Sequence, residues 1–318
     1  MARPASAVKR YEKRDWAKGG LAVYFLFFLL FLYGPILVMA VLSFQGSRGG
    51  LTFPLEGASF HWWRALVDTS IPLTHADAIR ETGLRSFRLS LAAGVVVSIL
   101  ALTLSMAFRR RFRGDGLLFY LVLLCLMTPG FLLSLGTALF WRSMGISPDI
   151  WKTALGTNAI WGLPFGFLVM VAVWNRYDRR IEEAARDLGA DAKTTFREVT
   201  LPLIWTGIFG CFLFGFTLSW NDYDRTALVL GSGQNTLPIQ IFAFTVGSVI
   251  RPDLYALGTA TTAVSLVAVG LFIVVAFVVL KRRGQAVAAA AQVKEELGEV
   301  VGAEIAEPAG LGAGARAS

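Results

Sequence analysis

Carboxylates and aromatic side chains converge at one point of the sequence, Trp220-Asn221-Asp222-Tyr223-Asp224, directly after a long apolar run. Ionisable groups near a lipid bilayer are costly unless they face water or a partner. A carboxylate exposed there could attract a cation, so Trp220, Asn221, Asp222 and Tyr223 form a candidate pore lining. The alternative is a solvated helix end with an interfacial tryptophan.

Residue types that serve catalysis elsewhere occur here without the spacing that catalysis needs. His61 and His75 lack the HExxH pattern, and Cys125 and Cys211 lie inside apolar runs with no spacing typical of a metal site or a disulfide. The G-x4-GK[ST] pattern that binds nucleotide phosphates is also missing from the sequence. We therefore expect no catalytic residue, no metal and no cofactor, and nothing favours a membrane-bound enzyme.

A second informative segment is 183–202, which reads EAARDLGADAKTTFREVTLP. Good helix formers from Ile181 to Leu188 are followed by Gly189, which predicts a helix that ends in a left-handed cap. Asp191 can cap a second short helix through about Glu198, and Pro202 suits the first turn of the next helix. The segment therefore predicts a helix-turn-helix held between two apolar runs.

This segment offers a surface for another protein. Ala184 and Ala185 are small enough to allow close approach, and Glu183 presents a charge to a basic partner. Because six Lys and Arg residues lie between Arg176 and Arg197, an amphipathic loop resting on lipid headgroups is the alternative.

The elements around these segments are membrane spans. The chain is 55% hydrophobic and 16% charged, and its mean hydropathy of +0.59 is too high for an ordinary soluble domain. Six charge-free runs are long enough to cross a bilayer as helices: 21–47, 89–108, 116–141, 153–175, 199–221 and 254–280. Pro129-Gly130 predicts a kink in the third. A seventh run, 226–250, contains Gly231, Gly233 and Pro238, and we interpret it as an outer hairpin or re-entrant piece.

Charge asymmetry predicts the orientation. With six spans and a cytoplasmic N-terminus, most of the 30 Lys and Arg residues lie on the inner side, so both termini are expected in the cytoplasm. The net charge of +8 follows from this orientation, and no nucleic acid is expected. We divide the chain into a basic cytoplasmic lead at 1–20, a transmembrane domain at 21–283 with a cytoplasmic loop at 176–202, and a flexible cytoplasmic tail at 284–318.

Segment 183–202 resembles the EAA loop of ABC importer permeases, with Glu183-Ala184-Ala185, Gly189 and Val199-x-Leu201-Pro202 at the family's spacing. Segments such as Tyr33-Gly34-Pro35-Ile36 and 216–222 are similar to the second permease subunit of spermidine/putrescine importers. The resemblance implies an all-α, type I importer (MetI-like) fold with six transmembrane helices in the bacterial inner membrane. It also implies an ATPase subunit dimer, a second permease subunit that forms a heterodimer with this chain, and an extracytoplasmic solute-binding protein. The expected docking residues for the ATPase subunit are Glu183, Ala184, Ala185, Gly189, Leu201 and Pro202.

The resemblance implies a polyamine-like solute, but two acidic positions of that pattern differ here. Gly130 follows the third-span proline, and Asn221-Asp222 ends the fifth span where the pattern has two acids. Opposite charges are what a polycation needs in a passage of low dielectric constant. An opine, an amino-acid-like compound, iron or thiamine is therefore the alternative solute. A secondary transporter is a distant alternative, because it would need charged residues inside the spans, and the six runs have none.

Overall fold

The computed structural model describes residues 5–47, 50, 52–68, 76–247 and 252–306, and the regular structure in these ranges is helical. The all-helical membrane fold that the sequence predicts is thereby confirmed. The elements are α1 (Ala5–Leu42), α2 (His61–Val67), α3 (Ala76–Ala107), α4 (Asp115–Met127), α5 (Gly130–Ser143), η1 (Ile150–Ala154), α6 (Leu155–Asn175), α7 (Arg180–Asp187), α8 (Ala192–Thr194), η2 (Thr195–Thr200), α9 (Leu201–Trp220), α10 (Leu237–Gly247) and α11 (Pro252–Ala306).

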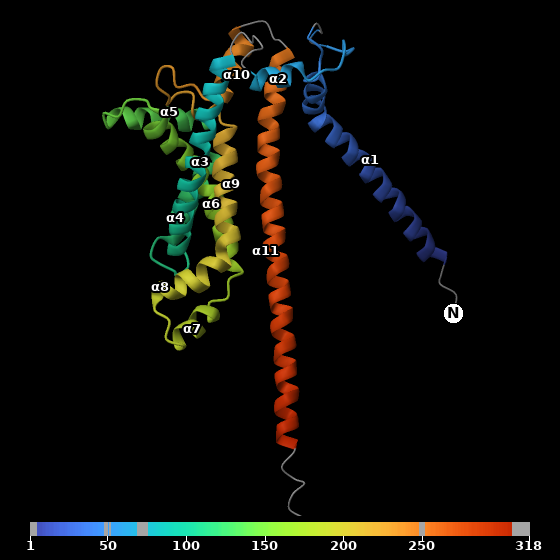
Figure 1. The fold of residues 1–318 in the computed structure, drawn as a ribbon, viewed down its shortest axis with the longest axis vertical. Coiled ribbons are helices and arrows are strands. Elements are labelled where there is room, and N and C mark those ends of the chain that lie inside the picture. The colour runs from blue at the N-terminus through green and yellow to red at the C-terminus, as the bar shows by residue number, and fades with distance from the viewer. Residues whose placement is uncertain (1–4, 48–49, 51, 69–75, 248–251, 307–318) are drawn as a thin grey trace, which may run out of the picture.

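The core of the molecule is the packing of α3, α6 and α9 on one another (Figure 1). Val97 of α3 and Phe167 of α6 are fully buried, as is Cys211 of α9, which packs as a small apolar residue. Small residues let the helices approach closely: a Cβ atom on Gly215 would lie 2.9 Å from the Cα atom of Gly94. These three helices form the rigid frame that positions both candidate sites.

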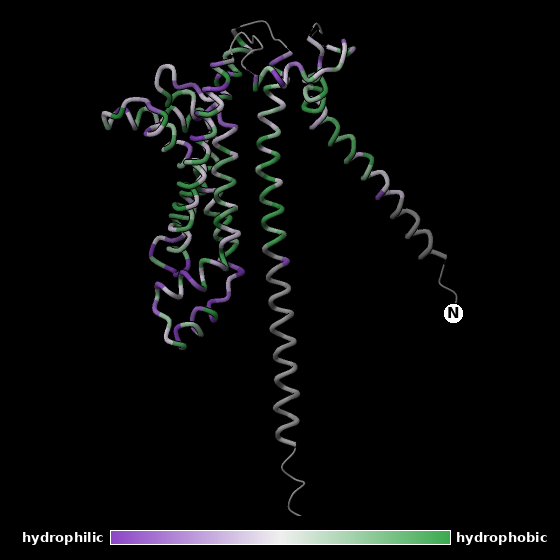
Figure 2. Tube along the Cα trace, viewed as in Figure 1, coloured by the Kyte–Doolittle hydropathy of each residue, from purple (hydrophilic) through white to green (hydrophobic). Residues whose placement is uncertain are grey.

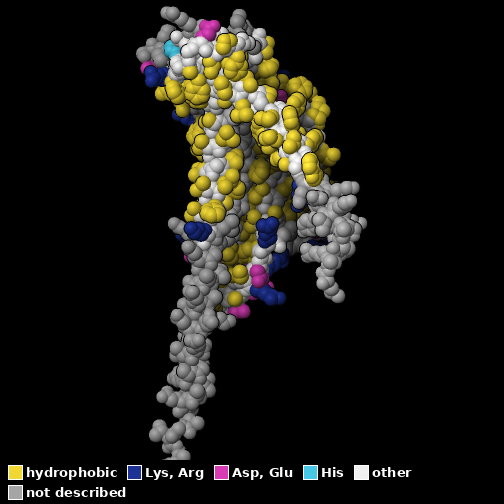
Figure 3. Space-filling model, turned by 90° about the vertical axis from the view of Figure 1, so that its right-hand side faces the viewer, with side chains coloured by type: hydrophobic (Ala, Val, Ile, Leu, Met, Phe, Trp, Pro, Cys, Tyr) yellow, Lys and Arg dark blue, Asp and Glu magenta, His cyan; other side chains and the backbone are white. Residues whose placement is uncertain are grey.

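The outer helices carry the apolar surface. α11 lies against α9 and α1 lies against α11, and α1 diverges from the core (Figure 1). Hydrophobic residues run along the described parts of α1 and α11 (Figure 2). They cover much of the face in Figure 3, where Lys and Arg side chains lie below them and also at the upper left. Among the described residues, five helices are long and apolar enough to cross a bilayer, or six if one bent pair counts as a span.

That bent pair corrects the interpretation of 116–141 as one kinked helix. α4 ends at Met127 and α5 starts at Gly130, and the two are bent by 112°. Thr128 and Pro129 between them are extended, with ψ angles of 124° and 134°. Proline disfavours the helical conformation of the preceding residue and has no N–H to donate, so the helix breaks instead of bending gently.

Three helix boundaries in the structure also differ from those expected from the sequence. The helix predicted from residue 89 begins at Ala76, the basic lead is part of α1 from Ala5, and α11 continues as one helix to Ala306. The stretch 284–306 is therefore helical, since it is rich in the good helix formers Ala, Glu and Gln. α10 has 11 residues and is too short to span a bilayer, as expected for 226–250.

Candidate functional site

α7 lies beyond the core, at the end of the molecule where α3 and α6 end and α9 begins (Figure 1). Asp178 precedes its first turn, and the Oδ1 atom of this residue accepts a hydrogen bond from the backbone N of Arg180 at 3.0 Å. Its last turn closes with backbone bonds from Gly189 N to Arg186 O at 2.8 Å and from Ala190 N to Ala185 O at 3.1 Å. This pair of bonds is a Schellman motif, and Gly189 has the positive φ of +90° that it requires. The predicted helix and its glycine cap are thus confirmed.

The second half of the loop differs from the predicted helix-turn-helix. Asp191 does cap a helix, because its Oδ1 accepts a hydrogen bond from Thr194 N at 2.9 Å. That helix does not stop near Glu198, however; α8, η2 and α9 form one continuous helical run from Ala192 to Trp220. η2 is π-helical, and this wider turn precedes Pro202, which has no N–H to donate. The loop is therefore one short helix joined by a turn to an extension of α9.

The outward face of α7 is exposed and partly apolar. Ile181, Ala184 and Leu188 lie three and four residues apart, so they share one side of the helix. Leu188 is 90% exposed and Ile181 is 44% exposed. Glu183 and Gly189 are also exposed, and Ala185 is half-buried. Such a face suits contact with another protein.

The two other predicted docking residues lie on α9. Leu201 is half-buried and Pro202 is exposed, both in the first turn of that helix. The predicted docking residues are therefore divided between α7, with its glycine turn, and the start of α9.

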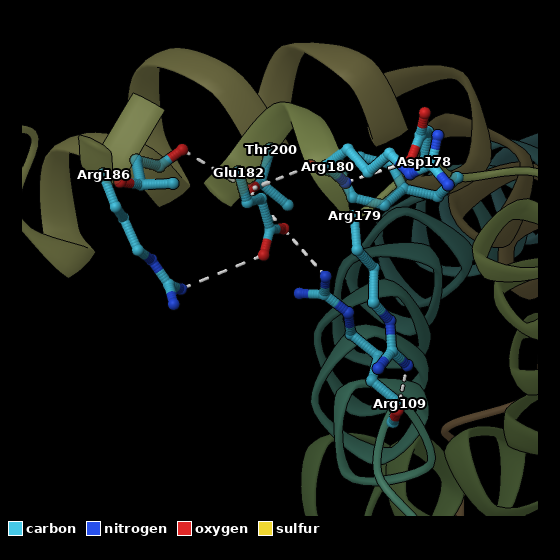
Figure 4. A network of polar contacts seen from close by, with 9 residues as sticks. Arg109, Asp178, Arg179, Arg180, Glu182, Arg186 and Thr200 are labelled. Atoms are coloured by element: carbon cyan, nitrogen blue, oxygen red, sulfur yellow. Dashed lines mark hydrogen bonds and ion pairs between the residues drawn. The ribbon is translucent and has the colours of Figure 1, made fainter. Parts of the chain in front are cut away.

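The inward face of α7 carries a residue that the sequence analysis missed. Glu182 is the one buried residue of α7, and it accepts hydrogen bonds from Arg109 Nη2 and from Thr200 Oγ1, both at 2.8 Å (Figure 4). Arg186 approaches the second carboxylate oxygen at 3.9 Å. The signal for this residue was the Glu182-Glu183 pair, since adjacent helix positions must point in different directions.

Arg109 connects this carboxylate to the core. It follows α3, and its guanidinium lies 4.4 Å from the ring centre of Trp174 and 5.3 Å from that of Tyr177. Burial raises the pKa of the Glu182 carboxyl, but hydrogen bonds from Thr200, Tyr177 and Arg109 outweigh it, so the pKa is lowered. Glu182 is therefore ionised at neutral pH and paired with Arg109.

The acidic cluster after α9 is arranged differently from the predicted exposed carboxylates. Asp222 is 1% exposed, and its Oδ1 lies 2.6 Å from Arg225 Nη2. Thr226 donates a hydrogen bond to the other carboxylate oxygen, and Asn158 Nδ2 of α6 donates to Thr226 Oγ1 at 3.1 Å. The carboxylate of Asp222 therefore orders the segment after α9, which Thr226 joins to α6, and it presents no free charge to solvent.

The neighbours of Asp222 divide between interior and surface. Trp220 is 5% exposed, and its Nε1 donates to Thr261 O of α11 at 3.2 Å, so it is not the exposed interfacial tryptophan of the alternative interpretation. Tyr223 is half-buried, with its ring centre 4.5 Å from that of Phe242. Asn221 is exposed and donates a hydrogen bond from Nδ2 to Ser265 Oγ at 3.1 Å.

The two candidate sites lie at opposite ends of α9, whose 20 residues span about 30 Å.

Comparison with known proteins identifies the family of the chain. Residues 94–286 match the family model described as "Binding-protein-dependent transport system inner membrane component". The chain is 28% identical over 242 residues to the spermidine/putrescine transport system permease protein PotC of Haemophilus influenzae, covering 76% of this chain and 90% of that protein. It is 30% identical over 237 residues to the putrescine transport system permease protein PotI of Escherichia coli, covering 72% and 80%.

Solved structures share the fold. One chain of a bacterial alginate ABC transporter in complex with alginate pentasaccharide-bound periplasmic protein matches with a TM-score of 0.57 and 13% identity, covering 83% of this chain and 94% of that one. A chain of a bacterial ABC transporter for alginate import matches with a TM-score of 0.54 and 18% identity, covering 85% and 97%. The chain therefore belongs to the family of binding-protein-dependent transport system inner membrane components, and it is a permease subunit of an ABC importer and not a catalytic subunit.

Proposed function

We propose that the outward face of α7 is where this permease binds the ATP-hydrolysing subunit of its importer. The observation that carries the proposal is the exposed Ile181–Ala184–Leu188 face, with Glu183 beside it, on a helix that projects beyond the core. An apolar stripe with a charged edge is suited to a groove in a protein partner. Gly189 sets the end of this helix, and Leu201 and Pro202 start the span that receives its motion.

The orientation follows from the charges around this face. Arg109 and Arg110 line one cleft together with Arg179 and Arg186, and Arg111 and Arg113 follow them in the connection between α3 and α4. Cytoplasmic loops of membrane proteins carry such an excess of positive charge. We therefore place α7 in the bacterial cytoplasm and both termini on that side, with α10 and the segment 221–236 facing outward.

The partners follow from the family. An importer permease works with an ATPase and a solute-binding protein. The exposed apolar sides of α1 and α11 leave room for lipid and for a second permease, which we expect to be a different chain. The outer segment near Asn221 and Tyr223 is the expected passage for solute released by the binding protein.

A polyamine-like cation is the solute that we propose first, on the basis of relatives named for spermidine and putrescine transport at 28% and 30% identity. The alternative solutes are opines, amino-acid-like compounds, iron and thiamine. The charge near the break between α4 and α5 weakens the case for a polycation. Position 130 is glycine, and a Cβ atom there would lie 3.3 Å from Arg225 Nη1. A cation thus occupies the space beside this position, and the carboxylate of Asp222 is already paired with it.

Two experiments test these proposals separately. Glu183→Lys should abolish co-purification of the ATPase subunit, because like charges at an interface cost several kcal/mol. The matched control is Glu198→Lys, an exposed carboxylate on η2; its complex should stay intact. Equal co-purification of the Glu183 variant and the unmodified chain would refute docking at this face.

The solute is tested by uptake. Membrane vesicles containing the complete importer and its binding protein should accumulate radiolabelled spermidine or putrescine when ATP is present. ATP-dependent uptake of an amino acid or thiamine, with no uptake of either polyamine, would establish the alternative.

A further inference from the structure

α7 is attached to the rest of the molecule by polar contacts. Within the described residues, none of the apolar core clusters includes a residue of α7. A cleft of about 420 Å³ lies between this helix and the end of α3, with Met106, Arg110 and Glu182 among its lining residues. Polar contacts therefore bear on the direction in which α7 points: Arg179 donates a hydrogen bond to Arg109 O, and Glu182 supplies the contact whose side chain is buried.

The contacts of Glu182 reach all three core helices. Arg109 comes from the end of α3 and also lies on the ring of Trp174 in α6. Thr200 is the last residue of η2, and the next residue begins α9. Figure 4 shows Arg109 and Thr200 converging on the Glu182 carboxylate from different elements.

We propose that Glu182, Arg109 and Thr200 form a rigid joint, here named the Glu182 joint, which fixes the direction of α7 relative to α3, α6 and α9 and transmits its movement to these spans. The three are positioning residues and not docking contacts. The inference rests on the proposed docking of the ATPase subunit on the outward face of α7.

Burial separates the Glu182 joint from the docking face. Thr200 is 1% exposed and Glu182 is 8% exposed, so neither is available to another protein, whereas the adjacent Glu183 is exposed. A substitution at Thr200 can affect transport only through its neighbours in this chain. That property makes Thr200 the most informative position for a test.

Hydrogen bonds to a charged group can hold the direction of α7 fixed relative to the core helices. Hydrogen bonds to an ionised carboxylate are short and directional, and removing one partner of a buried pair leaves the other unpaired. Arg109 and Thr200 come from different elements and both donate to Oε1 of the carboxylate, so a rotation of the carboxylate would break both hydrogen bonds. An apolar contact of similar area would allow α7 to slide.

The test is a distance measurement between α7 and the core. Spin labels are placed at Asp187 on α7 and Leu100 on α3, both exposed, after replacement of Cys125 and Cys211. Pulsed electron–electron resonance is recorded with the complete importer in lipid nanodiscs, without nucleotide and with ATP held by a hydrolysis-deficient ATPase subunit. The variants are Thr200→Val, which loses the hydroxyl at nearly constant volume, Thr200→Ser, which keeps it, and Glu182→Gln.

We expect one narrow distance, unchanged by ATP, in the unmodified chain and in the Thr200→Ser variant. Thr200→Val and Glu182→Gln should broaden it. In these two variants the ATPase subunit should still co-purify, and the number of solute molecules imported per ATP hydrolysed should fall about tenfold, as expected for a lost hydrogen bond to a charged group.

Two outcomes would overturn the proposal. The first is an unchanged narrow distance together with an unchanged transport ratio in both Thr200→Val and Glu182→Gln. The second is loss of ATPase co-purification in Glu182→Gln, which would make Glu182 a docking contact. The distance measured without nucleotide, in the permease without its ATPase subunit, tests the joint independently of docking. Failure of the docking proposal would be recognised separately, from the co-purification result for Glu183→Lys.

Discussion

Replacement of Gly189 tests whether the direction of α7 depends on one backbone conformation. Gly189 has a φ of +90°, and no heavy atom lies within 4 Å of the position that a Cβ atom would take. A side chain there causes no collision, so the cost is the left-handed backbone alone. This cost is about 1 kcal/mol for alanine and about 2 kcal/mol for β-branched valine, while asparagine tolerates the conformation. A cost of about 2 kcal/mol lowers the population of the correct turn by roughly 30-fold.

The assay is the affinity of the ATPase subunit for the permease in lipid nanodiscs. The expected order of affinity is glycine, asparagine, alanine and then valine at position 189. Gly145→Val is the matched control, since Gly145 also has a positive φ of +72° and an open Cβ position, but it follows α5 at the other end of the molecule. Its docking affinity should equal that of the unmodified chain. Wild-type affinity in Gly189→Val would refute the turn argument, and asparagine as harmful as valine would assign the effect to side-chain size.

Further substitutions address the rest of the account. Asp222→Asn should destabilise the detergent-solubilised protein by about 3 kcal/mol, because Arg225 loses its buried partner; normal melting with lost uptake would instead favour a role in the solute path. Hydrogen bonds from Thr194 lower the pKa of the Asp191 carboxyl. The stability that this cap contributes is therefore complete above the ordinary pKa of an aspartate, and it is lost as the pH falls through the lowered pKa. Asp191→Ala should lower the melting temperature at pH 7 and abolish this dependence of stability on pH. Gly215→Leu should prevent the core from packing and reduce the membrane yield, whereas a normal yield would contradict the close contact.

Much of the loop at α7 could be predicted because its signals are local. The helix formers after Ile181, the glycine cap at Gly189 and the aspartate cap at Asp191 each act within a few residues. The continuity of η2 with α9 could not be predicted, because a π-helical turn has no clear sequence pattern that distinguishes it from a helix break before proline.

The buried polar pairs could not be predicted for a different reason. Glu182 and Arg109 are 73 residues apart in sequence, and Asp222 is buried by a turn that brings Arg225 back onto it. Sequence alone gives no sign of which of two adjacent glutamates faces inward, or of whether an aspartate beyond a span points to water. Those outcomes depend on tertiary contacts.

Photo-cross-linking from α7 tests the central claim most directly. A photoreactive residue in place of Leu188, which is 90% exposed, is compared with the same residue in place of Leu117 of α4, which is 68% exposed and apolar. With the complete importer in native membranes, illumination should join the Leu188 variant to the ATPase subunit and the Leu117 variant to none. Absence of an ATPase adduct at position 188, with the complex intact, would contradict docking on the outward face of α7.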